Sequence, residues 1–80
     1  MTKYFFHLSE CGVVINDEEG REMPDFKSAR QYAVAAAREI ICAEVADGAL
    51  CLGCHIEIEN AGTGERQLVE FRDVVRITGE

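Results

Sequence analysis

One uninterrupted helical segment constrains the fold of this chain more than any other feature. From Phe26 to Ala46 there is no proline or glycine, and alanine, the strongest helix former, occurs seven times. Pro24 and Asp25 precede the segment, and the aspartate carboxylate can accept hydrogen bonds from the free N–H groups of a first helical turn. Asp47-Gly48 follows, with glycine available for a left-handed helix end. The sequence therefore predicts one helix over this segment.

The segments on either side of the helix have the pattern of β-hairpins. Residues 3–8 are rich in aromatic side chains and are separated by four residues from a second apolar run at 13–15. Residues 55–59 alternate strictly between polar and apolar, and residues 66–71 follow after a glycine-containing loop. The apolar tail at 73–77 is expected to pack as a short turn or strand.

These elements predict an α+β fold that forms a single domain over residues 1–80. The architecture is a two-layer β-β-α-β-β arrangement, with a four-stranded antiparallel sheet and one helix on one face. A right-handed crossover between the hairpins gives the strand order 2-1-3-4. No element is left for the other face of the sheet, where we expect Phe5 and His7.

The helix carries two apolar stripes at 100° per residue. The stripe expected to face the sheet consists of Ala29, Tyr32, Ala33, Ala36, Ile40 and Ala43. The second stripe consists of Val34, Ala37, Ile41 and Val45. One helix over a small sheet needs only the first stripe, so we predict a subunit or partner interface at Val34, Ile41 and Val45, with Phe5 on the uncovered sheet face. The alternative, that sheet twist covers both stripes, stays open.

Charge limits the classes of partner. Fifteen acidic residues against eight basic ones give a net charge of −7, and no basic cluster is present. Such a chain repels nucleic acids and anionic membrane surfaces. There is no apolar run of the roughly 18 residues that a membrane span needs, and the first residues lack the pattern of a signal peptide. We therefore expect a cytoplasmic protein with reduced cysteines.

Cys51-Leu52-Gly53-Cys54-His55 matches the C-x-x-C-H signature of c-type haem attachment. An alternating strand that begins here would point Cys54 and His55 to opposite faces, which does not suit thiol attachment combined with histidine ligation. A thioredoxin-like redox pair is disfavoured as well, because the cysteines follow a helix instead of preceding one.

Zinc binding is the other interpretation of these residues. A structural zinc site uses four thiolate or imidazole ligands, usually as two close pairs. Cys51 and Cys54 form one pair, but Cys11, Cys42 and the two histidines supply no second close pair. We predict no cofactor and interpret the cysteines as small apolar side chains. The alternative is a zinc site formed by Cys51 and Cys54 with His55 or His7.

No constellation of catalytic residues is evident, and we predict that the protein is not an enzyme. Ser28 is explained by its place in the first helical turn, and no glycine-rich phosphate-binding loop is present. The carboxylates of Glu57 and Glu59 share one strand face, without an implied pocket that would raise their pKa.

The opening residues 4–8, the turn at 17–20 and the Met23-Pro24-Asp25 start of an alanine-rich helix form a pattern that continues through the strand at 56–58 and a strand ending in Phe71. This pattern resembles a family of small bacterial proteins known only as a domain of unknown function. The resemblance implies no activity and no functional residues, and the cysteine pair at 51 and 54 is not part of the shared pattern.

Two hypotheses of different classes follow. The first is a non-enzymatic protein-interaction or regulatory module that self-associates, as a homodimer or with a protein partner. The second is a zinc-binding protein that uses Cys51, Cys54 and a histidine.

Overall fold

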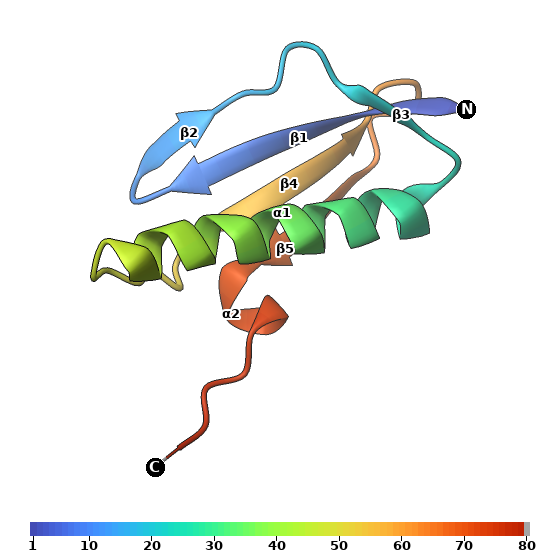
Figure 1. Cartoon of the computed structure of the whole chain (residues 1–80). Helices are drawn as coiled ribbons and strands as arrows, with labels where there is room; N and C mark the ends of the chain where they lie inside the picture. Colours follow the sequence, from blue (N-terminus) through green and yellow to red (C-terminus); the bar gives the residue numbers. More distant parts are fainter. Residues whose placement is uncertain (80) are drawn as a thin grey trace.

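A computed structural model describes residues 1–79 as one five-stranded sheet with a long helix across one face (Figure 1). The elements follow one another in the order β1 (Thr2–Glu10), β2 (Val13–Ile15), β3 (Arg21–Met23), α1 (Phe26–Ala46), β4 (His55–Asn60), β5 (Arg66–Glu70) and α2 (Phe71–Val74). The fold is α+β, as the sequence predicted, and the long helix has the predicted bounds. The predicted last strand ends one residue early, at Glu70, and Phe71 begins the single helical turn α2, which contains only the first two residues of the apolar tail at 73–77.

The sheet is antiparallel throughout, in the order β2-β1-β4-β5. This order agrees with the predicted arrangement of the two hairpins. The prediction of four strands is wrong, because β3 also pairs with β1, placing Lys3 opposite Glu22. Strand β1 is nine residues long, so β2 pairs with its end and β3 with its beginning along the same edge.

The turn between β2 and β3 directs β3 onto β1. The Asp17 carboxylate accepts backbone hydrogen bonds from Glu19 and Gly20 within the turn and from Phe6 on β1. Gly20 has a φ of 75°, and a Cβ there would lie 3.0 Å from the Tyr4 carbonyl oxygen. Glycine is therefore required at this crossing. Strand β3 has no apolar alternation that would have revealed it in the sequence.

Both ends of α1 form as predicted. The Asp25 side chain accepts a hydrogen bond of 2.8 Å from the backbone N–H of Ser28. This bond is the main cause that lowers the pKa of Asp25 below its ordinary value. At the other end, Gly48 adopts a φ of 84°, in the left-handed region that closes many helices.

The core lies between α1 and the central strands, with Phe71 and Val74 of α2 at its edge. Its fully or nearly fully buried members are Tyr4, Ala29, Ala33, Ala37, Ile41, Cys54, Ile56, Ile58, Val69, Phe71 and Val74. Small alanines at the contact allow the helix to approach the sheet closely.

The helix is rotated relative to the predicted stripe. Ala37 and Ile41, assigned from the sequence to the surplus stripe, are buried, whereas Tyr32 is 37% exposed and Ala43 is exposed. The reason is α2, which contacts α1 on that side, where the Arg38 guanidinium donates a 2.9 Å hydrogen bond to the Val74 carbonyl. The sequence-based stripe assumes that the helix packs only against the sheet.

Burial in the core predicts how the free energy of unfolding responds to the loss of one methyl group. Ile58 is completely buried on β4, and Ile15 on β2 is 54% exposed. We expect Ile58→Val to lower the free energy of unfolding by about 1 kcal/mol, and the matched Ile15→Val to change it by less than about 0.5 kcal/mol. Denaturant unfolding measures both. Equal effects would contradict this core.

Candidate metal centre

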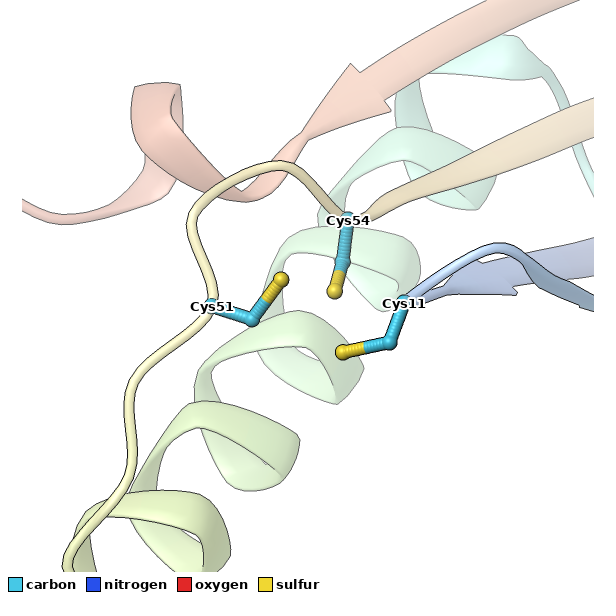
Figure 2. A group of neighbouring side chains, drawn as sticks. All are labelled: Cys11, Cys51 and Cys54. Atoms are coloured by element: carbon cyan, nitrogen blue, oxygen red, sulfur yellow. The ribbon is translucent and has the colours of Figure 1, made fainter.

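Three cysteine side chains meet at one end of the sheet, and we call them the thiol cluster. The sulfur atoms of Cys11, Cys51 and Cys54 all lie within 4.8 Å of one another (Figure 2). Cys11 lies in the turn between β1 and β2, and the other two lie in the loop between α1 and β4. One cysteine that precedes α1 in the sequence and two that follow it thus form one group of soft donor atoms.

The turn that carries Cys11 has an uncommon backbone. Glu10 pairs with Val13, so Cys11 and Gly12 are the two central residues of a tight hairpin turn. Their φ angles are 49° and 81°, the left-handed values of a type I′ turn. Asparagine or glycine is favoured at such a position, and cysteine is an unusual choice. A non-glycine residue in this conformation is a recognised indicator of a functional site.

The second segment is positioned by the end of α1 and the beginning of β4. The backbone N–H of Ala49 donates to the Glu44 carbonyl at 2.9 Å and turns the chain back toward the sheet. Cys54 comes directly before β4, is 1% exposed, and accepts a 3.0 Å hydrogen bond from the Phe71 N–H at its carbonyl. Cys51 is half-buried and Cys11 is exposed. The cluster therefore has a fixed inner thiol and an outer side open to solvent.

The three thiols differ in acidity. Hydrogen bonding from the Cys54 side chain, then from the Gly53 backbone and the Cys11 side chain, lowers the pKa of Cys51. Burial, followed by the hydrogen bond to Cys51, raises the pKa of Cys54 to about 11. Hydrogen bonding to Cys51 also raises the pKa of Cys11. Cys51 is thus the thiol that ionises first and the first available thiolate ligand.

Three thiolate sulfurs are a ligand set for a thiophilic ion. Soft sulfur donors select Zn²⁺, Cu⁺ or iron–sulfur clusters over Mg²⁺ and Ca²⁺. A tetrahedral zinc site has Zn–S bonds of about 2.3 Å, which separates its sulfurs by about 3.8 Å. Sulfurs within 4.8 Å of one another can reach this spacing with small side-chain rotations.

The predicted histidine ligands lie elsewhere. The zinc alternative combined Cys51 and Cys54 with His55 or His7, but the third side chain that the structure brings to the pair is Cys11. His55 lies on β4 opposite Ser9, on the alternate face from Cys54. This placement also agrees with the argument against haem attachment. The remaining cysteine, Cys42, is exposed on α1.

His7 is held by two hydrogen bonds on the uncovered sheet face. Its Nδ1 accepts from the backbone N–H of Asp17 at 3.1 Å, so the proton is on Nε2, which donates to Glu59 Oε1 at 2.9 Å. Both ring nitrogens are therefore engaged. The bond from His7, together with the nearby Arg66 charge, lowers the pKa of Glu59 despite its partial desolvation.

The residues of the predicted interface have different environments. Ile41 is 7% exposed and belongs to the core. Val34 is half-buried, Val45 is 55% exposed, and Phe5 is half-buried on the uncovered face, where its ring stacks on His7 with centroids 6.0 Å apart. Val34, Val45 and Phe5 thus reach the surface of the single chain.

A family model described as "Domain of unknown function (DUF6894)" matches residues 3–72. The chain belongs to this family. The matched range includes the whole thiol cluster, both hairpins and α1. No curated protein and no solved structure matches the chain. Among residues 1–79, no helix has the length and apolar character to cross a membrane.

Cys11 is the site residue that sequence reasoning missed, and a signal for it was present. In the predicted strand order, the end of the first strand lies beside the beginning of the third. A cysteine just after one and a cysteine just before the other must then meet at the same sheet end. A pattern of two close pairs along the sequence does not include this long-range combination.

The Asp17 hydrogen bonds predict a pH-dependent contribution to stability. Burial raises the pKa of Asp17, but the three backbone N–H donors together lower it by more, so the native pKa is below its ordinary value. The stability that the ionised carboxylate contributes is thus fully present above the pKa of the unfolded chain, about 3.9. It is lost as the pH falls through the lower pKa of the folded state. We expect Asp17→Asn to lower the free energy of unfolding by about 1–2 kcal/mol at pH 7.

Denaturant unfolding at pH 7 and at pH 3 tests this, with Glu18→Gln in the same exposed turn as the control. The difference between wild type and Asp17→Asn is expected to shrink at the lower pH. A difference that is the same at both pH values would show that the charged carboxylate is not what holds the turn.

Proposed function

We propose that this chain is a non-enzymatic metal-binding domain that holds one Zn²⁺ ion at the thiol cluster. The observation that carries the proposal is the convergence of three sulfurs, from segments far apart in the sequence, to within 4.8 Å of one another. The left-handed backbone at Cys11 supports it, because the turn places a thiol where asparagine or glycine would be more stable.

The arrangement of the cluster suits uptake of an ion from solution. Cys54 provides a buried anchor, Cys51 ionises first, and Cys11 lies at the exposed side. A bound ion would connect the β1–β2 turn to the loop before β4 and stabilise the folded chain by mass action. The proposal places the protein in the cytoplasm, where thiols stay reduced, and its net charge of −7 disfavours nucleic-acid partners.

Zinc titration of reduced, chelator-treated protein tests this function. We expect one zinc per chain by native mass spectrometry and a higher melting temperature in the zinc-bound form. Cys11→Asn suits the left-handed turn, so it should keep the fold while lowering zinc affinity by more than about 100-fold, the upper end of what a lost outer-shell partner costs.

Cys42→Ser is the matched control, because Cys42 is an exposed thiol outside the cluster. It should bind zinc like the wild type. Failure of the wild type to take up zinc, or equal affinity of the Cys11→Asn and Cys42→Ser variants, would overturn the proposal. Preferential uptake of Cu⁺ over Zn²⁺ would overturn the choice of ion.

A second candidate function is self-association, which the free edge of β2 favours. Val13, Val14 and Ile15 are 59%, 61% and 54% exposed on a strand at the end of the sheet. An unpaired apolar edge pairs readily with another strand. We propose a second copy as the occupant, since two β2 edges can pair antiparallel about a two-fold axis. The interface predicted from the sequence consists of Val34, Ile41, Val45 and Phe5. Ile41 is 7% exposed, so Val34, Val45 and Phe5 are the residues of that prediction that reach the surface.

Two lysine substitutions distinguish the β2 edge from the helix surface as the interface of a dimer. Val14→Lys is expected to shift the mass from dimer to monomer, because a charge on an edge strand opposes pairing. Val45→Lys should leave the dimer intact. Sedimentation over a range of concentrations measures both. A dimer lost only in Val45→Lys would assign the interface to the helix surface, and a monomeric wild type would exclude self-association.

A further inference from the structure

The thiols of the cluster lie close enough to react with one another. Cys11, Cys51 and Cys54 are free cysteines whose sulfurs lie within 4.8 Å of one another (Figure 2). A disulfide has an S–S bond of about 2.05 Å, so two of these sulfurs need to approach by less than about 3 Å. The fourth cysteine, Cys42, is exposed on α1 and does not belong to this group. The geometry thus allows a disulfide within the cluster.

Solvent reaches two of the three thiols. Cys11 is exposed and Cys51 is half-buried, whereas Cys54 is 1% exposed. Cys54 is also held in place, because its carbonyl accepts a 3.0 Å hydrogen bond from the Phe71 N–H. Cys11 and Cys51 lie in a turn and a loop, outside the helices and strands. An oxidant in solution therefore meets these two side chains, which we call the outer pair, before it meets Cys54.

The outer pair has the arrangement of a redox-sensing site. Such sites combine a solvent-accessible cysteine with a second cysteine beside it that completes a disulfide. In the cytoplasm, where we place this protein, disulfides are usually transient and belong to catalytic or redox-sensing sites. The left-handed backbone at Cys11 places an exposed sulfur beside the half-buried Cys51. These observations indicate a reversible modification at the outer pair.

We propose that Cys11 and Cys51 form a reversible disulfide on exposure to hydrogen peroxide, and that this disulfide releases zinc from the thiol cluster. The second half of the inference rests on the proposed zinc function and adds its regulation. The thiolate is the form of cysteine that binds a metal, and the two sulfurs of a disulfide are no longer thiolates. Oxidation leaves Cys54 as the one thiol of the cluster, and a structural zinc site uses four ligands.

The oxidation takes two steps. The sulfur of one outer cysteine attacks a peroxide oxygen and the O–O bond breaks, which gives a sulfenic acid and one water molecule. The sulfur of the other cysteine then attacks the sulfenic sulfur, so that the S–S bond forms and a second water molecule leaves. The two thiols lose two electrons and two protons, which reduce the peroxide to water. A small dithiol reverses the reaction by thiol–disulfide exchange and becomes a disulfide itself.

Alkylation of the zinc-free chain counts the thiols that peroxide consumes. Reduced, chelator-treated protein is exposed to one equivalent of hydrogen peroxide, and its remaining thiols are alkylated before the intact mass is measured. Of the four cysteines, we expect Cys42 and Cys54 to be alkylated, and peptide mapping should find Cys11 linked to Cys51. Treatment with dithiothreitol should restore four alkylated cysteines.

Three variants test the identity of the pair. Cys42→Ser is the matched control, because this exposed thiol lies outside the cluster, and it should form the disulfide like the wild type. Cys11→Asn, which suits the left-handed turn, and Cys51→Ser, in the loop, should both lose the disulfide. A link between Cys51 and Cys54, or four alkylated cysteines after peroxide treatment of the wild type, would overturn the proposed pair.

The zinc-bound chain tests the regulation. We expect peroxide to release one zinc ion for each disulfide formed, as measured with a colorimetric zinc indicator. A linked chain that keeps its zinc would contradict the regulation. Zinc uptake without formation of the disulfide contradicts this inference and leaves the zinc function in place. A wild type that takes up no zinc contradicts the zinc function and its regulation, and the zinc-free experiment then still decides whether the disulfide forms.

Discussion

The antiparallel pairing of β1 with β4 is the interaction on which the rest of the structure depends. It joins the two hairpins into one sheet, from Tyr4 opposite Asn60 to Ser9 opposite His55. The register places Ile56 and Ile58 on the side that α1 covers, and the charged residues of β4 on the uncovered side. Because the strands run in opposite directions, the end of β1 meets the beginning of β4, and the thiol cluster forms at this junction.

The contact between α1 and the sheet depends on small side chains. Ala29, Ala33 and Ala37 are completely buried, so the helix backbone approaches the strands closely. Larger residues complete the core from the flank, where Phe71 and Val74 of the last helical turn pack beside the helix. A chain of this size has little apolar surface to bury, and the apolar tail adds to the core without another long element.

Local patterns predicted the local structure well. The capping residues and the absence of proline and glycine were sufficient for the bounds of α1, and alternation was sufficient for the inner face of β4. Strand β3 was missed because backbone pairing and the Asp17 turn form it, with no apolar pattern of its own. The rotation of α1 depended on α2, which lies far away in the sequence, and a stripe of alanines has no intrinsic signal for one face over its neighbour.

The candidate site, too, could be predicted only in part from local sequence patterns. Its close pair, Cys51 and Cys54, is visible as a motif, but Cys11 joins it only through the pairing of β1 with β4. Spacing along the sequence was therefore a poor guide to a group of thiols that the sheet brings together.

The left-handed residue at Cys11 has a consequence for relatives of this chain. A two-residue turn of this geometry is most stable with asparagine followed by glycine, so a relative without the site gains hairpin stability by placing asparagine there. Cysteine at this position gives up some of that stability and places a sulfur at the sheet end. The residue before the turn glycine is thus a marker that can sort members of the family into those equipped with the third thiol and those that keep only the fold.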